Sequence, residues 1–345
     1  IEFEYVILDE AQYIKNQKSK NAQSVKTLKT RHKLALTGTP IENSLAELWS
    51  IFDFLMPQYL FNYHYFQKQY ENDIVKNNDE EKTKQLKKLV TPFILRRNKK
   101  EVLTELPDKI EQNMILPFND EEEKIYVANL AKANKELQEL YDLEGSDKMQ
   151  ILKLLTRLRQ LCLEPRLVYD NIDQPSSKLK ACMELIKTMQ ENKQKVLLFS
   201  SFTSVLDLIA EECQKAGITY YMLTGSTNKE DRRELVSRFQ KDDTTLFLIS
   251  LKAGGTGLNL TSAEVVIHFD PWWNVSAQNQ ATDRAYRIGQ KNNVQVFNLV
   301  MKDSVEEKII ELQKRKKELA DMFVENNSGG LSQMSKEDIL SLFTM

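Results

Sequence analysis

The chain has 345 residues and a mass of 40.2 kDa, and at a typical 100 to 200 residues per domain it should fold as roughly two domains. Hydrophobic residues make up 41% and charged residues 28%, which excludes global disorder, and the longest apolar runs fall far short of the roughly 20 residues that a membrane span needs. The net charge is −2 and the pI is near 6.1, so any nucleic-acid partner would have to be held by local basic patches.

Cysteine and histidine usage gives no sign of a disulfide framework or a metal cluster. Three widely spaced cysteines predict reduced, buried thiols inside a cell: Cys162, Cys182 and Cys213. The three histidines lack metal-ligand spacing, and His268 lies in a buried strand pattern. The first residue is Ile1 and residues 1–8 already resemble a buried strand, without signal-peptide anatomy. The chain is therefore expected to begin inside a larger protein.

The first half of the chain predicts part of an α/β sheet followed by helices. Residues 1–56 contain two strand-like runs and one helical run: Phe3–Leu8, Lys33–Leu36 and Leu45–Phe54. An aromatic and polar stretch from Pro57 to Leu89 predicts a helical insertion, and Phe93–Arg97 returns to a strand-like pattern. Two strongly helical runs follow, at Glu121–Tyr141 and Lys148–Leu163. The stretch Asp170–Ser177 is predicted to be a linker.

The second half alternates strands and helices regularly, which is typical of a parallel sheet. Five strands are predicted, at Val196–Phe199, Thr219–Leu223, Leu246–Ser250, Val265–Phe269 and Val294–Leu299. The amphipathic helices are Ser204–Lys215, Lys229–Gln240, Ser276–Tyr286 and Val305 to about Phe323, the second and last opening at capping-box patterns. A doubly wound sheet of this kind binds ligands at the carboxyl ends of its strands.

Two short motifs lie at such strand ends in the first half. Asp9-Glu10-Ala11-Gln12 directly follows a strand, where an Asp can help to hold Mg²⁺ while a neighbouring acid positions water. The alternative is an ordinary helix N-terminus, which favours acids through its dipole. About 25 residues on, Leu36-Thr37-Gly38-Thr39-Pro40 follows another strand. Alone it would be a turn, but after a strand at this distance from the acids it resembles the element of helicase-type motors that couples the nucleotide site to the other lobe.

A glycine-rich loop and two arginines mark the second half. Residues 254, 255 and 257 are glycines in the run after the strand ending at Ser250, and glycines let the backbone approach a phosphate. Arg284 and Arg287 are three residues apart and are predicted to share one helix face, where guanidinium groups can stabilise a transferring phosphoryl group. The alternatives are a plain tight loop and two solvated arginines.

These motifs together resemble those of the SNF2 (Swi2/Snf2) family of helicase superfamily 2. The resemblance rests on Asp9–Asn16, Leu36–Pro57, Phe93–Arg97, Val196–Thr203, Leu248–Asn274 and Gln280–Gln290, and it spans nearly the whole chain. Gln12, Tyr286 and Val275 depart from the residues usual in the family. The resemblance implies RecA-like parallel sheets, with a partial lobe one, a complete lobe two and SNF2-type helical insertions. The implied divisions are the C-terminal part of lobe one at 1–56 and the helical insertions up to the linker at 57–175. Lobe two follows at 176–303, and a C-terminal helix and tail at 304–345.

The resemblance also implies roles for single residues. Asp9 would act on Mg²⁺, Glu10 on the attacking water, and Arg284 and Arg287 on the nucleotide, with ATP between the lobes. Further ATP-binding residues would be Gln280, Gly255 and Gly257. The implied contacts to double-stranded DNA are Ser200, Ser201, Thr203, Lys252, Thr256, Asn259 and Trp273, since hydroxyls, amides and single lysines follow phosphates without reading sequence. Trp272 and Trp273 could equally be core aromatics. The resemblance implies that Arg96 and Arg97 lie near the hinge between the lobes. The basic clusters that contain lysine and arginine at Arg96–Lys100 and Lys314–Lys317 could equally be ordinary solvated surface.

One expected motif is missing. A P-loop needs Gly-Lys-Ser/Thr, yet none of the ten glycines is followed by Lys. The resemblance therefore predicts a double-stranded-DNA translocase that remodels protein–DNA complexes, of which these residues are a fragment that is inactive alone. The alternatives are a degenerate motor acting as a DNA-binding scaffold, and a strand-separating DNA or RNA helicase. A monomer in the cytoplasm or nucleoid, or in the nucleus of a eukaryote, is expected, with Mg²⁺ and ATP as cofactors and a DNA-bound protein complex as the target.

Overall fold

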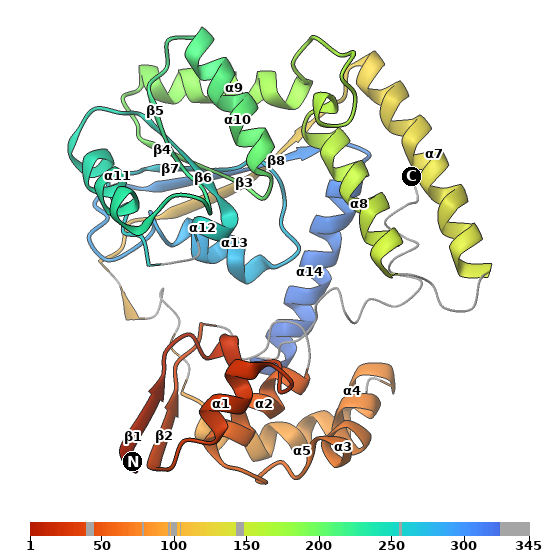
Figure 1. Cartoon of the computed structure of the whole chain (residues 1–345), viewed down its shortest axis with the longest axis vertical. Helices are drawn as coiled ribbons and strands as arrows, with labels where there is room; N and C mark the ends of the chain where they lie inside the picture. Colours follow the sequence, from red (N-terminus) through yellow and green to blue (C-terminus); the bar gives the residue numbers. More distant parts are fainter. Residues whose placement is uncertain are drawn as a thin grey trace. The chain divides into compact units, whose positions relative to one another are not determined.

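The computed structural model describes residues 1–38, 45–77, 79–95, 97, 102–103, 105–142, 148–254 and 257–324 (Figure 1). These residues form two compact units. The first unit comprises Ile1–Val102 together with the last helix from Leu312, and the second comprises Leu103–Glu311.

The first unit contains a parallel sheet of two strands, β1 (Phe3–Leu8) and β2 (Thr30–Ala35). One face packs on a small core, in which Val6 and Leu8 contact buried Ile14 and Phe54. The other face is exposed although its side chains are large and mostly apolar. The large exposed side chains of this open face include Phe3, Tyr5, Ile7 and Leu34, which are 43%, 61%, 56% and 47% exposed.

Helices make up the rest of the first unit. They are η1 (Ala11–Ile14), α1 (Lys20–Lys26), α2 (Leu45–Leu55), α3 (Tyr63–Phe66), η2 (Gln67–Glu71), α4 (Asn72–Asn77), α5 (Glu80–Val90) and η3 (Thr91–Phe93). The buried side of α2 packs on Leu60, Phe66 and Leu86. The helical structure predicted from Pro57 to about Leu89 is thus observed.

The strand predicted at Phe93–Arg97 is wrong. Thr91–Phe93 forms a 3-10 turn, and Ile94, Leu95 and Arg97 lie outside any strand. The aromatic ring of Phe93 instead packs on the rings of Tyr59 and Phe52, with centroid distances of 5.2 and 6.4 Å. These tertiary contacts override the β propensity of the Phe-Ile-Leu run.

The second unit is built on a parallel sheet of six strands in the order β3-β8-β7-β4-β6-β5. Their bounds are β3 (Lys109–Leu116), β4 (Val196–Ser200), β5 (Tyr220–Leu223), β6 (Leu246–Ser250), β7 (Val265–His268) and β8 (Val294–Met301). The five strands predicted in this half are confirmed. The edge strand β3 was not predicted; it pairs with β8 from Lys109 opposite Val294 to Leu116 opposite Met301.

Helices cover both faces of this sheet (Figure 1). The helices α9 (Ser177–Glu191) and α10 (Thr203–Lys215) pack on the face that carries Leu198 and Ile267. The other face, which carries Leu197 and Phe247, packs on α11 (Lys229–Lys241), α12 (Leu251–Gly254) and α13 (Val275–Thr282). The predicted doubly wound α/β architecture is confirmed for this unit.

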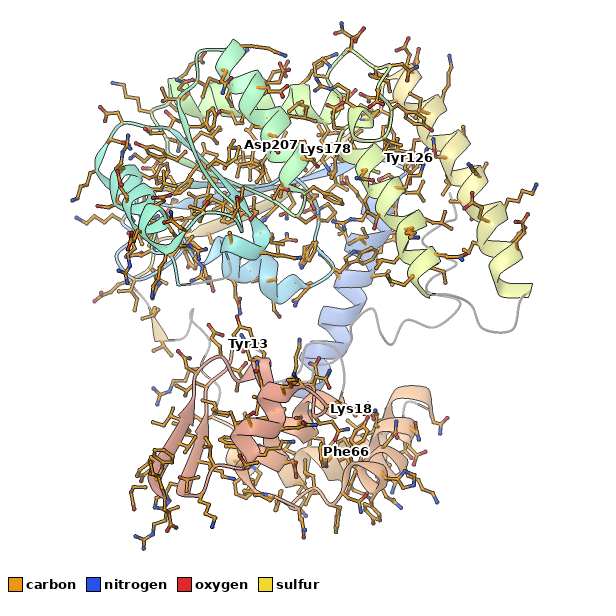
Figure 2. The ribbon with its side chains drawn as sticks, viewed as in Figure 1. Tyr13, Lys18, Phe66, Tyr126, Lys178 and Asp207 are labelled. Atoms are coloured by element: carbon orange, nitrogen blue, oxygen red, sulfur yellow. The ribbon has the colours of Figure 1, made fainter. Side chains whose placement is uncertain are left out.

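A helical pair and the last helix adjoin this α/β core. They are α7 (Asp120–Asp142), α8 (Lys148–Leu163) and α14 (Val305–Val324), with the 3-10 turn η4 (Pro165–Leu167) after α8. The start of α14 is anchored in the second unit, where the backbone N–H of Val305 donates to the Tyr126 hydroxyl at 2.8 Å. Figure 2 shows Tyr126 and Lys178 among the interior side chains of this unit. Lys178 and Glu306 form a fully buried ion pair at 2.7 Å.

The division into units differs from the predicted division at residue 176. Because β3 belongs to the second sheet, the second unit begins at Leu103, before both α7 and α8. The segment predicted as a linker, Asp170–Ser177, leads directly into the first turn of α9, where the Ser176 hydroxyl accepts a hydrogen bond from the backbone N–H of Leu179 at 3.0 Å. The helical pair is therefore an extension of the second unit.

All three cysteines are free and buried, as predicted, and burial raises the pKa of each thiol. His268 is buried in β7, also as predicted. Among the helices that the structure describes, none combines the length and apolar character needed to cross a bilayer.

Candidate functional site

The acidic pair after β1 is held in an unusual backbone turn. Glu10 has φ 52° and ψ 52°, in the left-handed region, and its N–H donates to a carboxylate oxygen of Asp9 at 3.0 Å. Both side chains are exposed. The helix that follows is a single 3-10 turn, and Glu10 makes no side-chain capping hydrogen bond to it. Glu10 therefore precedes this turn without capping it through its side chain.

Gln12 connects the acidic pair to the end of β2. Its side-chain N–H donates to a carboxylate oxygen of Glu10, and its carbonyl oxygen accepts from the Thr37 hydroxyl at 2.8 Å. The amide serves both partners because it contains a donor and an acceptor. The two strand ends are thus in contact through Gln12 and Thr37, while Thr39 and Pro40 lie outside the described residues.

The glycine loop follows β6 and packs closely on the sheet. A Cβ atom on Gly254 would lie 2.8 Å from the Phe199 ring, so only glycine fits there. Gly257 has φ 42°, a conformation that favours glycine. The side chains of Lys252 and Asn259 are exposed. Gly255 and Thr256, both predicted site residues, lie outside the described part of the chain.

Both predicted arginines contact the carbonyl groups of this loop. The Arg284 Nε donates to the Gly254 carbonyl at 3.0 Å, and the Arg287 Nη1 lies 3.5 Å from the Leu258 carbonyl. Arg284 is partly buried and Arg287 exposed. The structure therefore brings the two guanidinium groups and the glycine loop together, with Gln280 partly exposed on the preceding helix α13.

The prediction that the two arginines share a helix face is wrong. Helix α13 ends at Thr282, and residues 283–289 form turns. The backbone carbonyl of Arg284 accepts the Leu260 N–H at 2.9 Å, a bond that ties this turn to the end of the glycine loop. The sequence also gave no signal for Arg232, whose Nη2 on α11 donates to the Ala253 carbonyl.

A buried cluster lies at the carboxyl ends of β4 and β7. One oxygen of Asp270 accepts from the Ser200 hydroxyl at 2.7 Å and from the Ser201 N–H at 3.0 Å. The other accepts from the Ser201 hydroxyl and from Arg159 Nη2 at 3.0 Å. Ser200 was predicted to contact DNA, but its side chain is 1% exposed and committed to Asp270. Ser200 is therefore removed from the predicted contact set.

The other predicted DNA-contact residues of this region lie at or near the surface. Thr203 is exposed at the start of α10, and Ser201 and Trp273 are partly exposed. Trp272 is partly buried and packs against the core of the second unit, which agrees with its interpretation as a core aromatic residue. Asp270 lies in the run Leu248–Asn274 that carries the family resemblance, whereas the sequence gives no signal for Arg159, because a polar core residue leaves no periodic pattern.

His268 forms a neutral hydrogen-bonded group in the interior of the second unit. Its Nε2 lies 2.9 Å from the Thr282 hydroxyl, and burial lowers the pKa of the imidazole from 6.5 to about 4 even though the carboxylates of Glu111 and Asp270 oppose this shift. The unfolded chain would bind the proton near pH 6.5, so protonation favours unfolding as the pH falls from 6.5 to 4.

We expect His268 to remove about 3 kcal/mol from the free energy of unfolding between pH 6.5 and pH 4. Denaturant unfolding of the wild type and of His268→Gln at both pH values measures the difference, which separates this imidazole from the carboxylates that titrate in the same range. An equal loss of stability in both proteins would contradict a buried, neutral His268.

Comparison with known proteins addresses the family directly. The SNF2-related domain matches residues 1–167, and the helicase conserved C-terminal domain matches residues 177–289. The chain is 34% identical to the Sulfolobus solfataricus SWI2/SNF2 ATPase core solved in complex with dsDNA, with a TM-score of 0.57, covering 98% of this chain and 72% of that one. The chain belongs to the SNF2 family.

Sequence relatives agree with this assignment. The SNF2 chain is 39% identical over 342 residues to an uncharacterized ATP-dependent helicase of Mycoplasma pneumoniae, and 34% identical over 362 residues to the ISWI chromatin-remodeling complex ATPase ISW1 of Saccharomyces cerevisiae. Each match covers 99% of this chain but 32% of the relative. The SNF2 chain thus spans about a third of the length of these curated relatives, and its α/β units with parallel sheets are RecA-like, as predicted.

The acidic pair of this SNF2 chain fits a hard cation in part. Carboxylate oxygens are the ligand type that Mg²⁺ prefers, and Mg²⁺ usually takes only one or two of them, with waters and substrate phosphates completing its octahedron. The exposed carboxylate of Asp9 meets that requirement. Among the described residues, no group of three or more His, Cys, Asp or Glu side chains is arranged to hold a metal alone, so nucleotide and water would have to supply the remaining ligands.

Proposed function

We propose that the protein is an ATP-dependent translocase on double-stranded DNA that remodels protein–DNA complexes. The observation that carries the proposal is the joint hydrogen bonding of Arg284 and Arg287 to the glycine loop, at the carboxyl end of a parallel sheet. Ligands of doubly wound sheets bind at this edge, and paired guanidinium groups stabilise the charge of a transferring phosphoryl group.

The first unit supplies the acidic part of the proposed chemistry. Asp9 would hold Mg²⁺, which when bound neutralises phosphate charge, and Glu10 would orient the attacking water. Gln12 holds the Glu10 carboxylate and Thr37 in one hydrogen-bonded chain. In the second unit, Gln280, Gly255 and Gly257 are proposed to adjoin the nucleotide.

The proposed contacts to DNA are Ser201, Thr203, Lys252, Thr256, Asn259 and Trp273. Apart from Thr256, which lies outside the described residues, they are exposed or partly exposed side chains of the second unit. Support comes from their chemistry, since hydroxyls, amides and single lysines suit phosphate contacts that do not read sequence, and from the double-stranded DNA bound to the Sulfolobus relative. Monomeric action, a location with the DNA and a DNA-bound protein complex as target belong to the same proposal.

The proposal predicts that hydrolysis depends on both duplex DNA and residues outside this sequence. The 345 residues contain no Gly-Lys-Ser/Thr cradle, so we expect them alone to be inactive and the full-length protein to hydrolyse ATP faster when duplex is added. The measurement is phosphate release by both proteins, with and without duplex. Equal rates with and without duplex in an active full-length protein would contradict the translocase.

A strand-separating helicase is the second candidate, because the Mycoplasma pneumoniae relative is named an uncharacterized ATP-dependent helicase. The two functions differ in their product. A fluorescent duplex with a single-stranded tail would be unwound by a helicase, whereas a translocase would displace a bound protein from an intact duplex. Unwinding without such displacement would favour the second candidate.

A further inference from the structure

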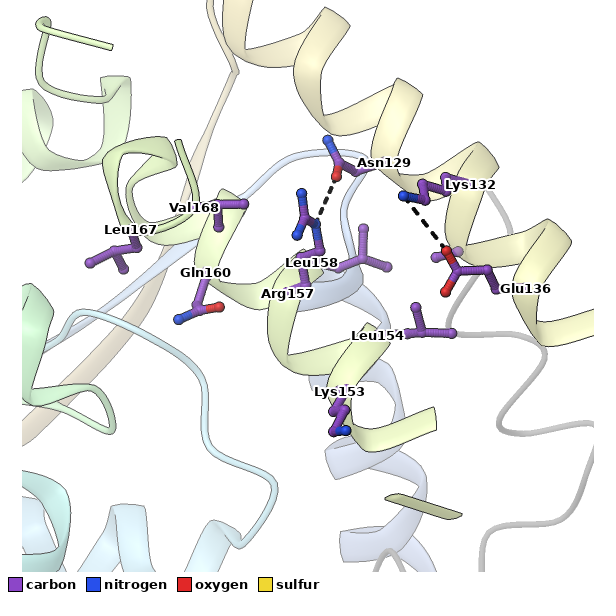
Figure 3. A pocket seen from close by; sticks show the side chains of 11 residues that line it. Asn129, Lys132, Glu136, Lys153, Leu154, Arg157, Leu158, Gln160, Leu167 and Val168 are labelled. Carbon is purple, nitrogen blue, oxygen red and sulfur yellow. Dashed lines mark hydrogen bonds and ion pairs between the residues drawn. The ribbon is translucent and has the colours of Figure 1, made fainter. Parts of the chain in front are cut away.

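Helix α8 carries two arginines that point in opposite directions. Residues two apart on an α-helix lie about 200° apart around its axis, so Arg157 and Arg159 face different neighbours. Figure 3 shows Arg157 directed toward Asn129 of α7, across a pocket lined by both helices. Its Nε donates to the Asn129 side-chain oxygen at 3.0 Å and its Nη2 to the Tyr169 hydroxyl at 3.2 Å. Arg157 is exposed.

Arg159 is buried on the opposite side of α8, against the loops after β4 and β7. Its side chain is 8% exposed. Nη2 lies 3.0 Å from both Asp270 Oδ2 and the Ser201 hydroxyl, and 3.4 Å from the Pro271 carbonyl. One guanidinium group therefore contacts the segments 200–202 and 270–273, which are distant in sequence.

Three aromatic rings surround the same guanidinium group. Its central carbon lies 5.0 Å from the ring centre of Phe202, 5.5 Å from that of Trp272 and 5.8 Å from that of Trp273. These distances are within the range of cation–π attraction. Phe202 precedes Thr203, and Trp273 is itself a proposed DNA contact, so Arg159 touches or adjoins three of the proposed contacts without being one.

Burial of this arginine is not explained by stability alone. A buried ion pair often contributes no more to the free energy of unfolding than well-packed apolar side chains of similar volume do. Stability therefore does not by itself account for an arginine at this position. A planar guanidinium with several donors in fixed directions can hold several acceptors and rings in one arrangement, which neither lysine nor methionine can do. Asp270 in turn orients Ser201 through its backbone and side chain.

We propose that Arg159 is a positioning residue that fixes the loops 200–203 and 270–273 in the arrangement needed to engage duplex DNA. This inference rests on the proposed function. It makes helix α8, which lies in the chain between β3 and the other five strands of the sheet, part of the apparatus through which duplex stimulates hydrolysis.

The test compares Arg159→Met with Arg157→Met in the full-length protein. For Arg159→Met we expect the duplex concentration that gives half-maximal stimulation to rise about tenfold, because misplaced contact groups weaken binding strongly, while hydrolysis without duplex stays within about twofold of wild type. Arg159→Lys keeps the charge but loses the planar set of guanidinium donors. We therefore expect its half-maximal duplex concentration to lie between those of wild type and Arg159→Met. Arg157→Met, on the same helix, is the matched control and should resemble wild type.

Tryptophan fluorescence provides a second readout that does not depend on DNA. In a Trp49→Phe background, acrylamide quenching of Trp272 and Trp273 should increase in Arg159→Met and stay unchanged in Arg157→Met. Unchanged quenching, or equal losses of duplex response in the two variants, would overturn the positioning role. If Arg159→Met does not fold, Arg159→Lys and its quenching decide the question. A wild type without duplex stimulation would refute the proposed function, while the quenching comparison would still test Arg159.

Discussion

Replacement of Arg287 by alanine is expected to lower duplex-stimulated ATP hydrolysis about a thousandfold or more, the range measured when arginine fingers are removed. Arg287 is exposed, and its Nη1 lies 3.5 Å from the Leu258 carbonyl. The guanidinium is therefore beside the glycine loop and accessible to a phosphoryl group. Because the proposed DNA contacts are other side chains, the affinity for duplex should stay near that of wild type.

Single-turnover phosphate release and duplex binding together measure this effect. The matched control is Arg238→Ala, since Arg238 is an exposed arginine on α11 whose carboxylate partner, Glu234, lies 3.7 Å away. We expect Arg238→Ala to change hydrolysis less than twofold, as surface substitutions usually do. Arg284→Ala should reduce hydrolysis as well, and it also removes the bond to the Gly254 carbonyl. Unchanged turnover in Arg287→Ala would exclude it as a finger.

Replacement of Lys178 by methionine is expected to lower the free energy of unfolding by about 3 to 5 kcal/mol, because it leaves a buried carboxylate without its counter-charge. Both oxygens of Glu306 lie 2.7 Å from the Lys178 Nζ, and the side chains are 0% and 1% exposed. The remaining donor to this carboxylate is the backbone N–H of Met301 at 2.8 Å.

Denaturant unfolding of wild type and variant measures this loss. Lys215→Met is the control, because Lys215 lies at a similar distance, 2.8 Å, from Glu212 but is 65% exposed; an exposed pair contributes at most about 1 kcal/mol. The double substitution Lys178→Met with Glu306→Leu removes both charges and should recover much of the loss. A Lys178→Met protein as stable as Lys215→Met would show that the buried pair does not fix the start of α14.

The strands of the second unit were predictable because three of them are buried on both faces. The runs Val196–Ser200 and Leu246–Ser250 are apolar at nearly every position, which is typical of central parallel strands. The edge strand β3 was not predicted, because Glu111, Gln112 and Asn113 interrupt its apolar pattern. Its pairing with β8 comes from tertiary contacts, including the hydrogen bond from the Asn298 side chain to Asn113 at 2.9 Å.

The candidate site was predictable where residue type alone suggests chemistry. The acids after β1, the glycine loop and the two arginines were all found from the sequence, and the structure places the arginines at the loop. The predictions that were wrong concerned local geometry. The end of α13 at Thr282 was missed because the residues after it also favour helix, and the burial of Ser200 was missed because Asp270, 70 residues away, accepts its hydroxyl.

The open face of the β1–β2 sheet has a consequence for handling the protein. Phe3, Tyr5, Ile7 and Leu34 expose large side chains on one face of this sheet, and in the described part of the chain no third strand pairs with either edge, which leaves edge N–H and C=O groups open to pairing. Strands of this kind self-associate when another copy supplies the missing neighbour. Solutions of the 345-residue chain should therefore aggregate as concentration rises, and lysine at Tyr5 or Ile7 should improve solubility without disturbing the second unit.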